Sequence, residues 1–305
     1  MVKPLHRSGF VAVVGKPNVG KSTLVNALVG HKISIVTSKP HTTRHAILGI
    51  LTEPESQIIF IDTPGLENKS RRLMNRFMNR AAVGALEGAS VILFVVDAGQ
   101  WGGGDKQTLQ LIKQSGLPCM LVVTKIDKIT PKEKLLPYLQ ASSERYDFAE
   151  IVPVSALRED NLQRLKETVL TYLPEEELLY PAEMLTDRGL RFQAAEVLRE
   201  KLMQTLRQEV PYGLGVEINE IGEDEKGLLR IDAIIWVDRE SHKGIVVGRG
   251  GQVLKKVGRA ARLDLQERLE RPLHLESHVK VKNNWSDNPQ ALRQMGYDDE
   301  SLLRK

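Results

Sequence analysis

The chain has 305 residues, 41% of them hydrophobic and 27% charged, which is typical of a soluble globular protein of about two domains. The longest apolar run near its middle, "VILFVV", is far too short to cross a bilayer, and the N-terminal stretch lacks the long apolar block of a signal peptide. One cysteine, Cys119, excludes an internal disulfide framework and favours the cytosol, while the net charge of +4 says little until its distribution is considered.

Short apolar runs alternate with amphipathic stretches from residue 9 to about 173. The helix candidates are "KSTLVNALVG" and "DNLQRLKETVLTYL". The predicted strands are "FVAVVG" (10–15), "QIIFIDTPG" (57–65), "VILFVVDAG" (91–99), "CMLVVTKID" (119–127) and "IVPVSA" (151–156). Near-continuous apolar strands alternating with helices predict an α/β domain, whose mostly parallel, doubly wound sheet is covered on both faces. Ligands of such sheets bind at the carboxyl ends of the strands.

The first strand leads into a phosphate-binding loop. Residues 15–22 read "GKPNVGKS" and precede the helix "TLVNALVG", so the G-x-x-x-x-G-K-S pattern stands in its strand–loop–helix context. Backbone amides freed by glycine can surround phosphate oxygens, Lys21 can reach the β- and γ-phosphates, and Ser22 can ligate Mg²⁺. The predicted contacts are Gly15, Lys16, Pro17, Asn18, Val19, Gly20, Lys21, Ser22 and Thr23.

Three further motifs end later strands in order: "DTPG" (62–65), "TKID" (124–127) and "VSA" (154–156). Asp62 can organise the Mg²⁺ shell, and the Gly65 amide can meet the γ-phosphate. Asp127 can accept hydrogen bonds from the ring N–H and amine of guanine, which adenine cannot offer. Together the motifs predict a GTPase with further contacts from Asp62, Thr63, Pro64, Gly65, Leu66, Thr124, Lys125, Asp127, Ser155, Ala156 and Leu157.

The base-reading motif departs from the common N-K-x-D, because Thr124 replaces Asn. The Asn side chain of such motifs ties neighbouring loops together, and a threonine hydroxyl reaches less far. We therefore expect GTP preference to survive through Asp127, with affinity lower by about 1 kcal/mol for one lost neutral hydrogen bond.

The stretch "HKISIVTSKPHTTRHAILGI" suits a switch segment that orders around Mg²⁺ and the γ-phosphate. Thr43 is the predicted Mg²⁺-sensing threonine and Thr42 the runner-up, so the predicted metal ligands are Ser22, Thr43 and Asp62. His41 and His45 are expected to face solvent, and residues 67–80 to form a second switch.

The catalytic residue is unknown from the sequence. Lys21, Thr43 and Gly65 are candidates for contacts to the γ-phosphate in the transition state. Leu66 follows "DTPG" where many GTPases place a water-orienting Gln, so slow intrinsic hydrolysis is expected. In related GTPases with a "PNxGKS" loop, the Asn helps to hold a potassium ion, which makes Asn18 a candidate for K⁺; the alternative is that Asn18 only shapes the loop.

The pattern changes at "LPEEELLYPAEMLTD". We expect a GTPase domain at 1–173, a linker at 174–187, a smaller α+β RNA-binding domain at 188–285 and a tail at 286–305. The second domain begins with the helical stretch "LRFQAAEVLREKLMQTL" and the strands "LGVEINEI" and "LLRIDAIIWV". A short helical segment, a glycine loop, a long helix to about Leu269 and the strand "LHLESHVKVK" follow.

The second glycine loop reads "VVGRGGQVL" and matches the KH signature (V/I)-I-G-x-x-G-x-x-I, which pins about four nucleotides by their backbone. The element order is that of a type II KH domain. Six basic residues and no acid lie between Lys243 and Arg262, although the C-terminal part of the chain is neutral overall. Such a gathered patch indicates a polyanion. The predicted RNA-binding residues are Gly248, Arg249, Gly250, Gly251, Lys255, Lys256 and Arg259.

The chain resembles the Era family of bacterial GTPases, of the TrmE-Era-EngA-like class, over nearly its full length. The residues that carry the resemblance are "GKPNVGKS", "HTTRH", "DTPGL", "TKID", "VSA", "TDR", "REKLM", "EVPYG", "VGRGGQVLKKVGRAAR" and "HLESHVKVKNNW". The resemblance implies a GTPase that uses GTP/GDP and Mg²⁺, binds 16S rRNA near its 3′ end and acts as a switch in small (30S) ribosomal subunit assembly. It further implies a cytoplasmic protein loosely associated with the inner membrane. We expect a monomer that does not bind DNA.

Two other functions remain open. The chain could be a constitutive RNA-binding assembly factor in which the nucleotide is structural, and Leu66 leaves room for this reading. It could also be a tRNA-modifying GTPase of the same loop class, which should carry a catalytic cysteine or a folate-type domain; neither is visible in the sequence.

Overall fold

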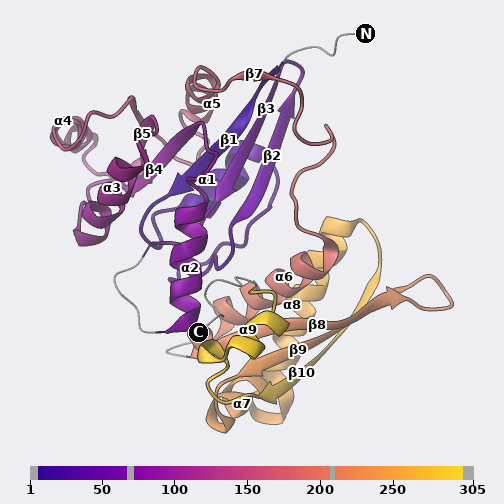
Figure 1. Ribbon diagram of the computed structural model, residues 1–305. Coiled ribbons are helices and arrows are strands. Elements are labelled where there is room, and N and C mark those ends of the chain that lie inside the picture. Colours follow the sequence, from indigo (N-terminus) through magenta and orange to yellow (C-terminus); the bar gives the residue numbers. More distant parts are fainter. Residues whose placement is uncertain (1–5, 67–71, 207–209, 298–305) are drawn as a thin grey trace. The chain divides into compact units, whose positions relative to one another are not determined.

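The computed structural model describes residues 6–66, 72–206 and 210–297, and its chain forms two compact units (Figure 1). Unit 1 comprises the described parts of Met1–Val36, Thr43–Ser70 and Met78–Asp187. Unit 2 comprises the described parts of Thr37–Thr42, Arg71–Phe77 and Arg188–Lys305. Two short pieces of the N-terminal half therefore belong to the C-terminal unit.

Unit 1 is built on a seven-stranded sheet with the order β2-β3-β1-β4-β5-β6, to which β7 adds by pairing with β1. Most strand pairs are parallel; β2 pairs antiparallel with β3, and β7 with β1. The strands are β1 (His6–Val14), β2 (Ile47–Glu53), β3 (Ser56–Asp62), β4 (Val91–Asp97), β5 (Cys119–Thr124), β6 (Glu150–Pro153) and β7 (Glu175–Glu176). The predicted mostly parallel sheet is confirmed.

Both faces of this sheet are buried, because alternate strand residues enter two different cores. Val11 and Val13 of β1 pack in one core with α1 (Lys21–Val29) and α5 (Leu162–Leu170). Ala12 and Val14 pack in the other with α3 (Gly103–Ser115) and α4 (Leu135–Ser143). Helix α2 (Leu73–Gly84) is divided between the units, since its residues up to Phe77 belong to unit 2. Short 3-10 turns lie at Ile126–Lys128 and Lys132–Lys134.

The expected linker at 174–187 is held along unit 1. Gln57 of β3 binds it through both amide atoms: its nitrogen donates to the Tyr180 carbonyl at 2.9 Å, and its oxygen accepts from the Leu179 and Tyr180 amides. Farther along, the Ile50 amide donates to the Leu185 carbonyl at 2.9 Å. The prolines and acidic residues of this stretch predicted a linker, and composition alone does not reveal these backbone contacts.

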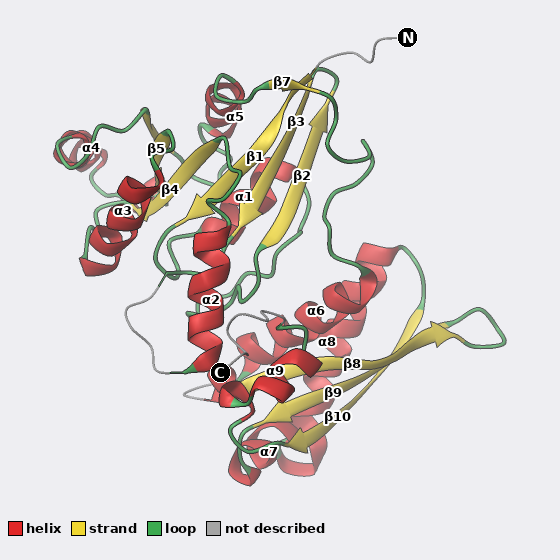
Figure 2. Cartoon of the chain, in the orientation of Figure 1, coloured by secondary structure: helices red, strands yellow, loops and turns green. Residues whose placement is uncertain are grey.

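Unit 2 is an α+β fold with a separate three-stranded sheet of order β10-β9-β8, shown with its strands in yellow in Figure 2. Strand β8 (Leu214–Glu223) runs antiparallel to β9 (Leu229–Val237), and β10 (Leu273–Val281) runs parallel to β9. Helices α6 (Leu190–Thr205), α7 (Glu240–Val247) and α8 (Gln252–Leu269) complete the order predicted for a type II KH domain. Short 3-10 turns lie at Val210–Gly213 and Arg249–Gly251.

Residues after β10 also fold onto unit 2. A 3-10 turn at Trp285–Asp287 leads into α9 (Pro289–Gln294), and Asn288 caps that helix by accepting a 3.0 Å hydrogen bond from the Ala291 amide. Trp285 is fully buried and donates from its indole nitrogen to the Gly213 carbonyl at 2.9 Å. The region expected to be a tail is therefore structured as far as residue 297.

Candidate functional site

The loop at 15–22 connects β1 to α1 with the backbone shape that phosphate binding requires. Gly20 has φ 102° and Asn18 has φ 62°, so the chain curls through left-handed conformations before the helix begins. The Lys21 ammonium donates to the carbonyls of Gly15 and Lys16, at 3.1 and 3.0 Å. The cation is thus held directly over the loop that is expected to receive the phosphates.

The three predicted metal ligands converge beside this loop. The hydroxyls of Ser22 and Thr43 lie 2.7 Å apart, and Asp62 is fully buried. Neither carboxylate oxygen of Asp62 makes a well-aligned hydrogen bond within the described residues, although the hydroxyls of Ser22, Ser34 and Thr43 lie around it. A buried carboxylate that lacks direct partners, flanked by hydroxyl oxygens, fits a hard divalent cation such as Mg²⁺.

Burial sets the protonation of the two central charges. It lowers the pKa of the Lys21 ammonium to about 8, and the negative charge of Asp62 offsets only part of that shift. It also raises the pKa of Asp62, while the surrounding hydroxyls and Lys21 act in the opposite direction. Each group would be more stably charged with further counter-charges nearby, as a Mg²⁺–triphosphate would supply.

The "DTPG" loop closes tightly on the phosphate-binding loop. A Cβ at Gly65 would lie 2.6 Å from the backbone nitrogen of Pro17, so only glycine fits there. The Leu66 amide donates to the Gly15 carbonyl at 3.2 Å, and the Thr63 hydroxyl donates to the Val13 carbonyl at 2.7 Å. The Leu66 side chain is buried, so it packs rather than facing a reacting water.

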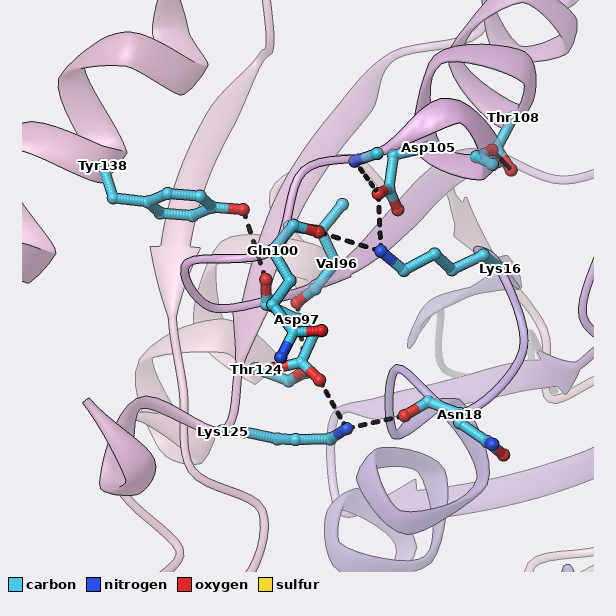
Figure 3. A network of polar contacts seen from close by, with 12 residues as sticks. Lys16, Asn18, Val96, Asp97, Gln100, Asp105, Thr108, Thr124, Lys125 and Tyr138 are labelled. Carbon is cyan, nitrogen blue, oxygen red and sulfur yellow. Dashed lines mark hydrogen bonds and ion pairs between the residues drawn. The ribbon is translucent and has the colours of Figure 1, made fainter. Parts of the chain in front are cut away.

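The base-reading residues are also brought together. The Ser155 hydroxyl donates to Asp127 Oδ1 at 2.7 Å, which fixes the carboxylate. Lys125 has φ 59°, and its ammonium donates to the Asn18 carbonyl at 2.6 Å and pairs with Asp97 at 2.7 Å. Figure 3 shows Lys125 joining the phosphate-binding loop to the end of β4 in this way. Leu157, the last predicted contact, is largely exposed.

Thr124 keeps the loop-tying role that its short side chain was expected to weaken. Its hydroxyl lies 2.5 Å from the Val19 carbonyl and 3.0 Å from the Val96 carbonyl, and it can donate its one proton to either. The hydroxyl therefore reaches both the phosphate-binding loop and the neighbouring strand. The contact that was expected to be lost is thus made by the described residues, and the lower affinity inferred from its loss stays a prediction.

The sequence analysis missed a second brace on the phosphate-binding loop. The Lys16 ammonium binds Asp105 Oδ2 at 2.7 Å and the Gln100 carbonyl at 2.8 Å (Figure 3). Asp105 is fully buried near the start of α3 and also accepts from the Gly102 amide at 2.8 Å. The "GGGD" stretch at residues 102–105, where α3 begins, was a signal that could have suggested this tight turn.

The two candidate threonines of the first switch segment have different partners. Thr43 faces Ser22, whereas the Thr42 hydroxyl contacts Thr37 Oγ1 at 2.6 Å and the Lys39 carbonyl at 2.7 Å. The geometry therefore favours Thr43 as the metal-sensing residue. The expectation that His45 faces solvent is wrong, because this side chain is buried. Of the predicted second switch, residues 67–71 lie outside the described residues.

The predicted RNA-binding loop joins α7 to α8 through three left-handed glycines. Gly248, Gly250 and Gly251 have φ 72°, 58° and 75°. A Cβ at Gly248 would lie 2.4 Å from a methyl of Val253, whereas Gly250 and Gly251 face open space. Gly248 is thus required by the fold of the loop itself, and the other two leave its backbone accessible to a ligand.

Four basic side chains project from this loop and the first turns of α8. Arg249, Lys255, Lys256 and Arg259 are all exposed, and none makes a salt bridge among those found in the described residues. Behind them Val246, Val257 and Ala261 are buried in the core of unit 2. The arrangement presents a bare backbone and positive charge together, as a nucleic-acid backbone requires.

No helix in the described part of the chain is long and apolar enough to span a membrane.

Two family models match the chain. Residues 10–125 match "50S ribosome-binding GTPase", and residues 209–286 match "KH domain". The GTPase Era of Xanthomonas campestris pv. campestris (strain B100) is 48% identical over 293 residues, covering 96% of this chain and 98% of its own. That of Stenotrophomonas maltophilia (strain K279a) is 47% identical over the same shares.

Solved structures of Era match over both units. Era in complex with MgGDPNP and nucleotides 1506–1542 of 16S ribosomal RNA has a TM-score of 0.93 and 44% identity, covering 96% of this chain and 99% of its own. A tyrosine-to-alanine variant of Aquifex aeolicus Era bound to GDP.AlF4- has a TM-score of 0.93 and 44% identity, covering 97% and 99%.

Proposed function

The chain belongs to the Era family of GTPases, and from this premise we propose that its nucleotide state controls RNA binding during assembly of the small ribosomal subunit. The chain is a GTPase with a C-terminal KH domain. The observation that carries the proposal is the exposed, basic glycine loop at residues 248–251, which stands in the same chain as a complete GTPase motif set. Each loop would present backbone that is little covered by side chains to a different phosphate.

In the nucleotide site, Lys21 would contact the β- and γ-phosphates, and the Gly65 amide would meet the γ-phosphate. Ser22, Thr43 and Asp62 would hold Mg²⁺. The closeness of the two hydroxyls and the full burial of the Asp62 carboxylate support this role. When bound, Mg²⁺ neutralises charge that develops on the phosphates. Asp127 would read guanine while Ser155 holds its carboxylate in place.

The RNA would be 16S rRNA near its 3′ end. Era bound to nucleotides 1506–1542 of 16S ribosomal RNA is 44% identical to this chain over 96% of its length, which supports this choice. Sequencing RNA crosslinked to the protein in cells tests it. Enrichment of the 16S 3′ end that is lost in a variant of the 248–251 loop is expected, and equal recovery of unrelated RNA would contradict it.

Potassium would complete the hydrolytic site. Leu66 is buried and has no side-chain amide to orient water, so positive charge near Asn18 would take over part of the stabilisation of the transition state. Asn18 is exposed within the phosphate-binding loop, and its backbone carbonyl accepts a hydrogen bond from the Lys125 ammonium. A single-turnover rate that rises in K⁺ over Na⁺, with the rise lost in Asn18→Ala, is the expected result.

Leu66 also favours a second function, in which the nucleotide is structural and turnover incidental. Single-turnover hydrolysis with and without potassium and RNA separates the two. A rate that responds to neither ligand supports the constitutive RNA-binding factor. A rate that responds to either supports the switch.

For its location, we propose a cytoplasmic protein loosely associated with the inner membrane, as its resemblance to the Era family implies. Fractionation of cells followed by a high-salt wash tests this. Recovery of part of the protein with membranes and its release by salt are expected, whereas complete absence from membranes would contradict the peripheral association.

A further inference from the structure

Six residues of the first switch segment belong to unit 2, and they are anchored on α6. This segment, Thr37–Thr42, is followed directly by Thr43, which belongs to unit 1. The Lys39 ammonium donates to the carbonyls of Met203 and Leu206, at the C-terminal end of α6. A cation there complements both the helix dipole and the carbonyls that have no partner within the helix.

The segment is also held by hydrogen bonds between its own residues. The hydroxyls of Thr37 and Thr42 lie 2.6 Å apart, the Lys39 amide donates to Thr37 Oγ1 at 3.1 Å, and the Thr42 hydroxyl donates to the Lys39 carbonyl at 2.7 Å. His41 packs edge-on against Tyr212, with ring centroids 5.8 Å apart. These contacts brace the segment against local changes of conformation.

A buried arginine holds the last residue of the segment. Arg199 of α6 is 1% exposed, and its guanidinium meets Glu196 through two bonds, Nε to Oε1 at 2.7 Å and Nη2 to Oε2 at 2.5 Å. Its Nη2 also donates to the Thr42 carbonyl. Because Glu196 fixes the guanidinium and neutralises its charge, the position of the Thr42 carbonyl is set by a rigid donor.

The next residue is Thr43, whose hydroxyl lies 2.7 Å from that of Ser22. The carbonyl of one threonine is therefore held by α6, and the side chain of the next lies at the proposed metal site. A single peptide bond separates the two contacts. Because the peptide unit is planar and rigid, holding the Thr42 carbonyl also restrains the Thr43 Cα, and only rotations about φ and χ1 of Thr43 remain to place its hydroxyl.

We propose that Arg199 is a positioning residue for GTP hydrolysis, which acts through the Thr42 carbonyl to place the Thr43 hydroxyl at the metal. The inference rests on the proposed role of Thr43.

The test compares Arg199→Lys with Lys39→Met in the full-length protein. Lysine keeps the charge of Arg199 but loses the fork that serves Glu196 and Thr42 together. Lys39→Met releases the other anchor of the segment and leaves the Arg199–Glu196 pair intact, so it remains informative if the arginine variant folds poorly. Arg191→Ala is the matched control, since Arg191 also lies on α6 and donates to a backbone carbonyl, that of Ile218 at 2.7 Å.

The readouts are affinities for GDPNP and GDP with Mg²⁺ and the single-turnover rate of GTP hydrolysis. In Arg199→Lys we expect GDPNP affinity and the rate each to fall about tenfold, the effect of one charge-assisted hydrogen bond, with a smaller fall in Lys39→Met. GDP affinity and all properties of Arg191→Ala should stay unchanged. A purely structural role for Arg199 would instead lower affinity for both nucleotides alike.

Thr43→Ala separates this inference from the proposed function. If Thr43→Ala leaves GDPNP affinity and the hydrolysis rate unchanged, the proposal that Thr43 binds the metal is wrong. If Thr43→Ala lowers both while Arg199→Lys and Lys39→Met lower neither, only the positioning role of Arg199 is overturned. The double variant of Arg199→Lys and Thr43→Ala should be no worse than Thr43→Ala alone, because both changes remove the same contact.

Discussion

The Ser155 hydroxyl donates a 2.7 Å hydrogen bond to the Asp127 carboxylate, although 28 residues separate them in the chain. The two residues follow the neighbouring strands β5 and β6, which pair in parallel. Parallel pairing brings the carboxyl ends of both strands to one edge of the sheet, and this is how two short motifs come together as the predicted base-reading site.

Replacing Asp127 by Asn should move nucleotide preference from GTP toward XTP. The carboxylate accepts from the ring N–H and the exocyclic amine of guanine, whereas an amide presents one donor and one acceptor, which suits the extra carbonyl of xanthine. Titration of both nucleotides into the variant measures this. Unchanged GTP affinity would show that Asp127 does not read the base.

Replacing Thr124 by Val should lower GTP affinity by about 1 kcal/mol, or roughly fivefold, because valine keeps the shape but loses the hydroxyl near the Val19 and Val96 carbonyls. Thr124→Asn, which restores the common motif, should stay within about twofold of the parent. Calorimetry on both variants checks this. A valine variant that binds as tightly as the parent would show that the hydroxyl does not support the loop.

Nucleotide binding should weaken as pH rises through about 8, where the buried Lys21 ammonium loses its proton. Between about 8 and its usual pKa of 10.5, GTP binding should draw a proton back onto Lys21, since the phosphates favour the charged form. Calorimetry at pH 9 in buffers of different ionisation enthalpy measures that uptake. Uptake that persists in Lys21→Met would assign it to another group.

The same titration has a consequence for stability. Above pH 8 the unfolded chain binds more protons at Lys21 than the folded chain, so the free energy of unfolding should rise with pH up to about 10.5, relative to Lys21→Met. Below pH 8 the cost of burying the charge is constant. Urea melts at pH 7 and pH 9.5 compare the two proteins, and an equal change in both would contradict the assignment.

Replacing both Arg249 and Gly250 by Asp should abolish RNA binding and leave GTP binding unchanged. Both positions are exposed, and a Cβ at Gly250 meets no atom within 4 Å. Aspartate is among the residues that best tolerate the φ of 58° at Gly250, so repulsion of phosphate is the main effect. Gly248→Asp should also abolish RNA binding, but its Cβ would strike Val253, so it tests the loop less cleanly. Retained crosslinking to RNA in the double variant would refute the assignment of residues 248–251 as the RNA-binding loop.

Much of this architecture was predictable because its signals are local. The apolar runs at 10–15, 57–65, 91–99, 119–127 and 151–156 identified parallel strands, since both faces of those strands are buried. Strand β2 was missed because it is an antiparallel neighbour joined to β3 by a short turn, and no helix intervenes to mark it. Its sequence also overlaps the stretch interpreted as a switch.

The contacts that could not be predicted from the sequence are those between distant segments. Lys16 and Asp105 are 89 residues apart, and neither belongs to a motif that specifies the other. Thr42 and Arg199 are 157 residues apart, and a basic residue within a helical pattern is most simply interpreted as exposed. The reach of the Thr124 hydroxyl was underestimated for the same reason, because it depends on how closely β4 and the phosphate-binding loop approach.

The central claim is that the nucleotide state controls RNA binding, and the most direct test is the affinity of the full-length protein for an oligonucleotide of the 16S 3′ end, with GDPNP and with GDP. We expect the two dissociation constants to differ by about tenfold or more, within the usual range of coupling between two sites. Dissociation constants that are equal within error, with both nucleotides saturating, would contradict it.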